Sequence, residues 1–435
     1  MSNTIEHLRD QYDQLQLSRS DNALKSIREN AYQAFNKMGV PGARHEEWKY
    51  TRISTLFNKE YHFPLIPDLP GTAELKAVEL PGHDEANILY FINGVFSAAH
   101  SRILSPELIV TPLEEAVEGP DSAIVTKWLG DSAQYSKDGI NALNTAFSTG
   151  GVFISIPEGK SVAHPVFLYN ISDARAVNVF AQPRSLVHLG QNARVQIIET
   201  YKTLGSGESF TNQVMEMIVE QDAWLEYYKL QYDAPQANLV ATTHIRQVGK
   251  SHVHTVVLSL SGGIIRNNLN VVMAAPHSEA HLYGLYFLDK STHVDNHTLV
   301  DNVEPHCFSN QLYKGIMNDR STGVFNGKIF VRQKAQKTNA YQSNKNILLS
   351  PEAIVNAKPQ LEIFADDVKC SHGCTVGQLD EEAMFYIRAR GIPEKEAIAM
   401  LIHAYALDVL EHIKPVFLRE YVDNLITSSL DSTQA

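Results

Sequence analysis

Apolar side chains recur with helical periodicity near the start of the chain. The positions that share one helical face are Leu24, Ile27, Ala31, Phe35 and Met38. Gly39 and Pro41 follow directly and predict the end of this helix. Three closely spaced prolines between residues 64 and 70 then indicate a stiff linker. We therefore expect an N-terminal helical domain with its linker over residues 1–70.

From about residue 150 to residue 368 the pattern changes to short runs rich in valine, isoleucine and tyrosine, separated by Gly, Asn, Asp and Pro. Such runs predict β-strands. A weak repeat is visible among them, with corresponding positions spaced by 30, 29 and 28 residues at Ala193, Ala223, His252 and Ala280. Repeats of this length indicate stacked units, because one unit cannot bury its own apolar face. A β-solenoid fits best, and a β-sandwich with evenly spaced hairpins stays an alternative.

The rest of the chain is organised around this β-rich region. We expect a core domain over residues 71–375, with a mixed, partly helical segment at 101–148. Residues 376–435 read as a C-terminal helical domain, in which Gly391 ends one helix and Pro393 begins the next. That second helix carries a wide apolar stripe, formed by Ile398, Leu401, Ile402, Tyr405, Val409, Leu410 and Ile413. Packing within the small helical domain is the favoured explanation of the stripe, and contact with a partner protein stays open.

Composition excludes several classes of function. The chain has 435 residues, a formal net charge of −12 and a pI near 5.8, which argues against nucleic acid or anionic membrane as a partner. The first residues are polar and acidic, unlike a signal peptide, and no stretch reaches the roughly 18 apolar residues of a membrane span. Only three cysteines are present, so we expect free thiols and a reducing, cytoplasmic location.

Two of the three cysteines flank a histidine in the run Lys369-Cys370-Ser371-His372-Gly373-Cys374. If this run is a strand, the two cysteines and the histidine project from one face, with neighbouring donors about 6.6 Å apart. Such a row is too wide for one small ion unless Gly373 bends the strand, and it suits a cluster or a metal shared with a second chain. Lys369 and His372 are candidates to favour the thiolate of Cys370. Two buried cysteines beside a hydrogen-bonded histidine are the alternative explanation.

A second concentration of histidines lies between residues 277 and 307. It contains His277, His281, His293, His297 and His306 beside Cys307. On strands and turns this spacing is a weak metal signal, and ordinary hydrogen bonding explains it better. Two Gly-Lys-Ser triplets lack the upstream glycine of a phosphate-binding loop, so we expect this chain to bind no nucleotide and to be no ATPase.

Four segments carry a family resemblance. They are KPQLEIFADDVKCSHGCTVGQLDEEAMFYIRARGI (358–392), RHEEWKYT (44–51), VDNHTLVDNVEPHCFSNQLYKGI (294–316) and FNGKIFVRQKAQKTNAYQSNKNILLS (325–350). Together they resemble the SufB and SufD family of iron-sulfur cluster assembly proteins. The His-Gly pair after Cys370-Ser371 is closer to the SufD branch than to the SufB branch. One departure is Cys374, which stands where the family pattern usually has alanine.

The resemblance implies a right-handed parallel β-helix core with flanking helical domains. It also implies a non-enzymatic scaffold subunit that pairs with SufB, binds the ATPase SufC, and can form a homodimer when isolated. A transient iron-sulfur cluster or iron would be held at the SufB/SufD interface. By matching position, His372 and Cys370 are the expected ligands, Cys374 is a further candidate, and SufC would dock on Leu401, Tyr405 and Val409.

Three other functions are weighed against this one. A SufB-like cluster scaffold and a zinc-binding structural protein that uses Cys370, His372 and Cys374 both fit the same short motif. A β-helix enzyme acting on polysaccharides would share the solenoid. Such enzymes are usually exported and place carboxylates with arginine on the coil faces, and neither feature stands out in this sequence.

Overall fold

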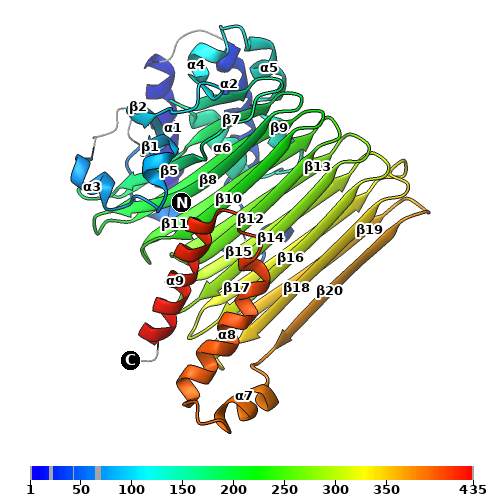
Figure 1. The fold of residues 1–435 in the computed structure, drawn as a ribbon. Coiled ribbons are helices and arrows are strands. Elements are labelled where there is room, and N and C mark those ends of the chain that lie inside the picture. Colours follow the sequence, from blue (N-terminus) through cyan, green and yellow to red (C-terminus); the bar gives the residue numbers. More distant parts are fainter. Residues whose placement is uncertain (1, 19–22, 43, 64–69, 434–435) are drawn as a thin grey trace.

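Short strands in the middle of the chain coil into a parallel β-solenoid, seen in Figure 1 as a stack of arrows running from green to orange. The structure is a computed structural model, and it describes all residues except 1, 19–22, 43, 64–69 and 434–435. Strands alternate between two sheets along most of the sequence, so each coil adds one strand to each sheet. The predicted mainly-β solenoid with helices at both ends is therefore confirmed.

Sheet 1 has ten strands. In spatial order they are β2 (Val95–Arg102), β1 (Asn87–Ile92), β5 (Val166–Asp173), β8 (Arg194–Leu204), β10 (Trp224–Tyr232), β12 (His252–Ser261), β14 (Glu279–Leu288), β16 (Phe308–Met317), β18 (Asn339–Leu348) and β20 (Lys369–Gly377). All neighbours are parallel except β1 and β2, which are antiparallel.

Sheet 2 faces sheet 1 across the solenoid. In spatial order its strands are β19 (Ile354–Ile363), β17 (Thr322–Val331), β15 (His293–Asn302), β13 (Ile264–Met273), β11 (Ala237–Gln247), β9 (Ser209–Val219), β7 (Arg184–Leu189), β4 (Val152–Ile156) and β3 (Ile109–Pro112), and β6 (Val179–Ala181) also pairs with β9. Only β3 and β4 are antiparallel.

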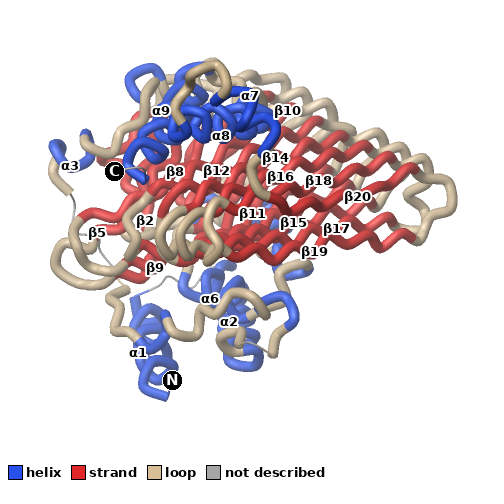
Figure 2. The backbone as a smooth tube through the Cα atoms, turned by 90° about the horizontal axis from the view of Figure 1, so that it is seen from below, coloured by secondary structure: helices blue, strands red, loops and turns tan. Residues whose placement is uncertain are grey.

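Helices lie on opposite sides of the solenoid, as Figure 2 shows. The α-helices are α1 (Ser2–Ser18), α2 (Ala23–Met38), α3 (Thr72–Lys76), α4 (Leu113–Ala116), α5 (Ser122–Trp128), α6 (Gly139–Phe147), α7 (Glu381–Arg388), α8 (Glu394–Leu410) and α9 (Val416–Thr433). Short 3-10 turns are η1 (Glu46–Trp48), η2 (Leu56–Asn58), η3 (His83–Glu85) and η4 (Asp131–Gln134). In the part of the chain that the structure describes, no helix combines the length and apolar character needed to cross a membrane.

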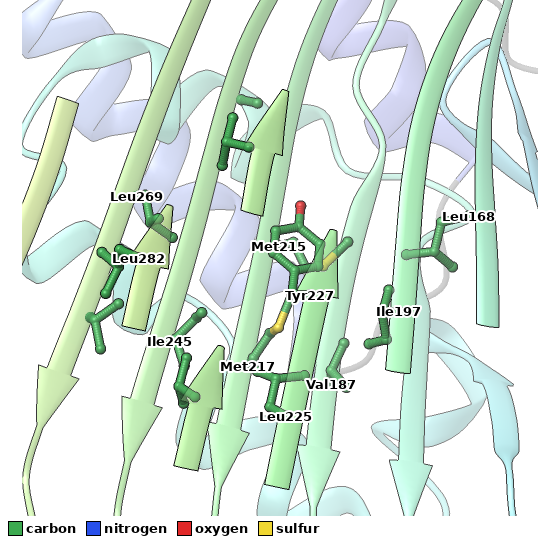
Figure 3. Packing of buried hydrophobic residues seen from close by; sticks show 14 of the residues in the cluster. Leu168, Val187, Ile197, Met215, Met217, Leu225, Tyr227, Ile245, Leu269 and Leu282 are labelled. Atoms are coloured by element: carbon green, nitrogen blue, oxygen red, sulfur yellow. The ribbon is translucent and has the colours of Figure 1, made fainter. Parts of the chain in front are cut away.

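The space between the two sheets is filled mainly by apolar side chains, because alternate residues of every strand point inward. Figure 3 shows Met215 and Met217 of β9 facing Leu225 and Tyr227 of β10 within this core. All four are at most 1% exposed. Burying a side chain of this size stabilises the fold by about 1.5–3 kcal/mol, so the stacked coils hold one another.

The repeat found in the sequence is correct in length but not in register. Ala193 and Ala223 each lie one residue before the paired positions Arg194 and Trp224. Trp224 in turn pairs with His252, and Ala280 pairs with Val253 rather than with His252. The turns between strands differ in length from coil to coil. The residue at which a polar turn gives way to an apolar strand therefore does not occupy the same paired position in every coil. The domain boundaries near residues 70 and 375 stay predictions, while the segment at 101–148 contains α4, α5 and α6.

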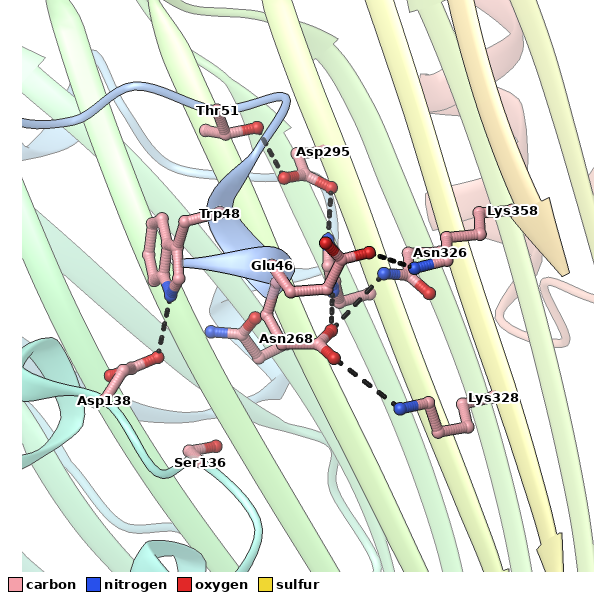
Figure 4. Close-up of polar contacts among 12 residues, drawn as sticks. Glu46, Trp48, Thr51, Ser136, Asp138, Asn268, Asp295, Asn326, Lys328 and Lys358 are labelled. Atoms are coloured by element: carbon pink, nitrogen blue, oxygen red, sulfur yellow. Dashed lines mark hydrogen bonds and ion pairs between the residues drawn. The ribbon is translucent and has the colours of Figure 1, made fainter. Parts of the chain in front are cut away.

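The RHEEWKYT segment fastens the N-terminal region to the outer face of sheet 2 (Figure 4). Trp48 Nε1 donates a hydrogen bond of 3.1 Å to Asp138, the residue that caps α6. Thr51 Oγ1 and Arg266 Nη1 donate to the same carboxylate oxygen of Asp295, at 2.5 and 2.8 Å. Burial opposes ionisation of Asp295, but its cationic neighbours outweigh burial and hold its pKa well below the usual range. This buried pairing ties residues far apart in sequence to one face of the solenoid.

The C-terminal helices pack on the outer face of sheet 1. Val409 of α8 is fully buried in the same cluster as Tyr283 of β14. In the turn after α8, the ring of His412 stacks on Tyr283 with centroids 3.5 Å apart. Its carbonyl accepts a 2.8 Å hydrogen bond from His254 Nε2 on β12. Burial lowers the pKa of His254 to about 4, so the docked state requires a neutral imidazole.

The buried imidazole of His254 predicts acid sensitivity of the folded state. A histidine with an ordinary pKa of 6.5 in the unfolded chain and about 4 when folded binds more protons after unfolding. Its contribution is therefore present above pH 6.5 and is lost as the pH falls towards 4, with a total of about 3 kcal/mol. Urea unfolding at several pH values should show this slope, and His254→Gln should reduce it. An unchanged slope in the variant would contradict the assignment.

Candidate functional site

The solenoid ends at two strands that, among the described residues, each pair with a neighbour on one side only. β20 pairs with β18 and β19 pairs with β17, and each is the last strand of its sheet. Apolar side chains are exposed there, with Ile354 53%, Phe364 58% and Val376 50% exposed. An edge strand with unpaired backbone groups and exposed apolar side chains is a template for another chain.

The Cys-His-Cys run lies on β20, at this open end. In register with the preceding strand, Cys370 lies opposite Ala340, His372 opposite Gln342 and Cys374 opposite Asn344. These three residues of β18 are at most 3% exposed, so their side chains point into the solenoid. In-register parallel strands present corresponding residues on the same face. The two cysteines and His372 therefore share the inner face of the last coil, as the alternation predicts.

Gly373 does not bend the strand. β20 continues from Lys369 to Gly377 with unbroken pairing to β18, so the row of donors stays straight. Neighbouring donors along such a strand are about 6.6 Å apart. Within the described ranges of the chain, no three histidine, cysteine or acidic side chains are placed to hold one metal ion. A self-contained zinc site on β20 is not supported by this geometry.

The surroundings of the two cysteines of β20 raise the pKa of both thiols. Burial raises the pKa of Cys370, which packs against a buried apolar cluster that includes Ala340 and Ala365. Burial also raises the pKa of Cys374, although this residue is largely exposed and its Sγ lies 3.7 Å from Asn344 Oδ1. The hypothesis that Lys369 and His372 favour the Cys370 thiolate is wrong, because neither contributes to the shift. Binding of a metal would have to displace the proton.

The histidines between residues 277 and 307 lie mostly on turns and strands. His277 and His306 occupy left-handed turn positions on neighbouring coils, each with φ of 60°, and their rings stack at 4.8 Å. His297 Nε2 lies 3.0 Å from Asp295 on the outer face of sheet 2. Cys307 is buried, its pKa is raised to about 11 by burial, and its Sγ contacts the Glu304 carbonyl. Hydrogen bonding and stacking account for these residues.

The predicted docking residues of α8 are only partly accessible. Val409 is fully buried against sheet 1, while Leu401 and Tyr405 are half-buried, with Lys314 Nζ 4.1 Å from the Tyr405 ring centroid. The exposed large apolar side chains of α7 and α8 are instead Phe385, Tyr386, Met400 and Leu407. The sequence did contain a signal for this surface, namely the adjacent aromatic residues Phe385 and Tyr386 in a short helix that begins with acidic residues.

Comparison with known proteins identifies the family. A profile described as the SUF system FeS cluster assembly SufBD core domain matches residues 170–405, and one for the SufBD N-terminal region matches residues 2–168. The chain is 30% identical over 403 residues to an iron-sulfur cluster assembly SufBD family protein of Synechocystis, covering 90% of this chain and 88% of the relative. It is 30% identical over 394 residues to the iron-sulfur cluster assembly protein SufD of Escherichia coli, covering 89% and 88%.

A more distant relative agrees along nearly the whole length. The iron-sulfur cluster assembly protein SufD of Bacillus subtilis is 22% identical over 414 residues, covering 90% of each chain. Together the two profiles cover the N-terminal helices, the solenoid, α7 and part of α8. The chain belongs to the SufBD family of iron-sulfur cluster assembly proteins and is SufD-like.

Proposed function

We propose that this protein is a scaffold subunit that completes a transient site for iron or a nascent iron-sulfur cluster together with a SufB partner. The observation that carries the proposal is the position of Cys370, His372 and Cys374 on the inner face of the terminal coil. Iron and the cluster are cargo in this scheme. A holder that must release its cargo works with an incomplete ligand set, which the partner chain completes.

Pairing at the open end is the first partner contact in the proposal. The edges of β19 and β20 offer unpaired backbone groups, and Phe364 and Val376 offer apolar contacts beside them. A SufB chain would extend both sheets and bring its own donors towards His372. In the absence of SufB, a second copy of this chain would use the same edges as a homodimer.

Docking of the ATPase SufC is the second contact. We place it on the exposed aromatic side chains of α7, Phe385 and Tyr386, continued by Met400 and Leu407 of α8. Leu401 and Tyr405 would border this surface, while Val409 would support it from beneath. Nucleotide-driven movement of SufC would then reach sheet 1 through α8, whose Asp408 pairs with Lys314 of β16 at 2.5 Å. The chain itself would bind no nucleotide and would work in the cytoplasm.

A SufB-like role is the second candidate, and Cys374 is the observation that favours it. An additional thiol on the cluster-facing side of β20 would give this chain a second sulfur donor. The two roles differ in whether the chain holds a cluster without a SufB partner.

Removing the imidazole should deplete the assembly of metal. In a complex co-expressed with SufB and SufC, His372→Ala should leave assembly intact and lower iron and acid-labile sulfide to about a tenth or less. Ser371→Ala, on the neighbouring outward-facing position of β20, is the matched control and should retain both. Unchanged iron in the His372 variant would remove this residue from the mechanism.

Two phenylalanines should separate the partner contacts. Phe385→Ser on α7 should weaken SufC binding at least about tenfold, because exposed aromatic anchors dominate such interfaces, and should leave SufB pairing intact. Phe364→Ser at the open end should weaken SufB pairing and leave SufC binding intact. Each variant is the control for the other, and pull-down titrations measure both. Equal loss of both partners, or of neither, would contradict the assignment of the two surfaces.

A further inference from the structure

A row of polar side chains crosses the interior of the last three coils of sheet 1 and ends at His372. Gln311 of β16 is in register with Gln342 of β18, and Gln342 is in register with His372 of β20. Gln311 and Gln342 are 0% and 3% exposed. Amide side chains stacked in this way along a sheet form hydrogen-bonded ladders parallel to the backbone bonds.

The hydrogen bonds give this ladder a direction. Thr298 Oγ1 of β15 donates across the interior to Gln311 Oε1 at 2.7 Å. Gln342 Nε2 donates to the same oxygen at 3.4 Å. The amide nitrogen of Gln342 is thus directed towards Gln311 on the preceding coil. Gln342 Oε1 is buried and has no hydrogen-bond partner within the described structure.

The opposite sheet leaves room for Gln342. Gly327 of β17 faces it, and a Cβ at this position would lie 2.4 Å from Gln342 Nε2 and 2.7 Å from its Cδ. A side chain at residue 327 would displace the end of Gln342, so Gly327 leaves the space that the amide occupies. A buried acceptor without a donor costs roughly 1–3 kcal/mol, which makes a donor at that rung favourable.

We propose that Gln342 is a positioning residue for His372. Its Oε1 accepts the N–H of the His372 imidazole when the open end is covered, and this bond fixes the tautomer and the ring orientation. The other ring nitrogen then presents its lone pair to the cargo at the partner interface. Ligating histidines commonly hold their second nitrogen in such a bond, which raises the basicity of the ligand. The inference rests on the proposed role of His372 as a ligand.

The tautomer of His372 tests the inference without any metal. Nitrogen-15 chemical shifts of histidine-labelled protein, in the full chain and in its complex with SufB and SufC at about pH 8.5, report which ring nitrogen carries the proton. Wild-type protein in the complex should show one predominant tautomer. Gln342→Met, which keeps length but removes the acceptor, should return His372 to the mixture seen for free histidine. Gln342→Glu, which keeps an acceptor oxygen, should restore the single tautomer.

The matched control is Gln311→Met, which removes an amide of the same row one coil deeper. It should leave the His372 tautomer unchanged, whereas a merely structural role of the row would make both substitutions equivalent. Affinity of the complex for Co²⁺ should fall about 10- to 100-fold in Gln342→Met and little in Gln311→Met.

The outcomes separate the positioning role of Gln342 from the role of His372 as a ligand. A tautomer that is unchanged in Gln342→Met overturns the positioning role, whatever the effect of His372 on iron. A changed tautomer with unchanged Co²⁺ affinity keeps the positioning contact and rejects His372 as a ligand. If Gln342→Met loses its circular-dichroism signature, Gly327→Ala gives the same test, because it displaces the amide and should also change the tautomer.

Discussion

The pairing of backbone groups along the two sheets is the constraint on which this structure depends. Each coil satisfies the N–H and C=O groups of the coil before it, so every internal strand is stabilised by two neighbours. The stack has to stop at both ends. At its start, the parallel pattern changes to the antiparallel strands β2 and β3. At its far end, β19 and β20 keep the parallel geometry, and in the described part of the chain one side of each strand has no sheet neighbour.

The proposed ligand site lies at that open end. A donor on an internal coil would be surrounded by its own chain, whereas donors on β20 point into an interior that a partner can close. The polar row from Gln311 to His372 shows that the interior near this end is not purely apolar, unlike the core around Met215 and Leu225. Burial raises the pKa of Cys370 and of Cys374.

The sequence predicts the solenoid because even a weak repeat of 28 to 30 residues reports the approximate length of one coil. It also places Cys370, His372 and Cys374 on one face, since alternation in a strand is purely local. It fails where the outcome depends on packing between elements. From the sequence, the apolar stripe that contains Val409 suits packing within the helical domain or contact with a partner, whereas the fold packs Val409 against sheet 1. The role of Gln342 depends on strand register and on Gly327 of the opposite sheet, neither of which periodicity reveals.

The central claim is that the terminal coil is an unfinished surface which a second chain completes. Hydrogen–deuterium exchange of the backbone amides of Lys369–Gly377, measured for the chain diluted to a monomer and after addition of SufB, tests it most directly. We expect exchange of these amides to slow when SufB is added, because edge groups gain partners, while β10 in the middle of sheet 1 stays unchanged. Equally fast exchange of β20 in the bound and the free chain would contradict the account.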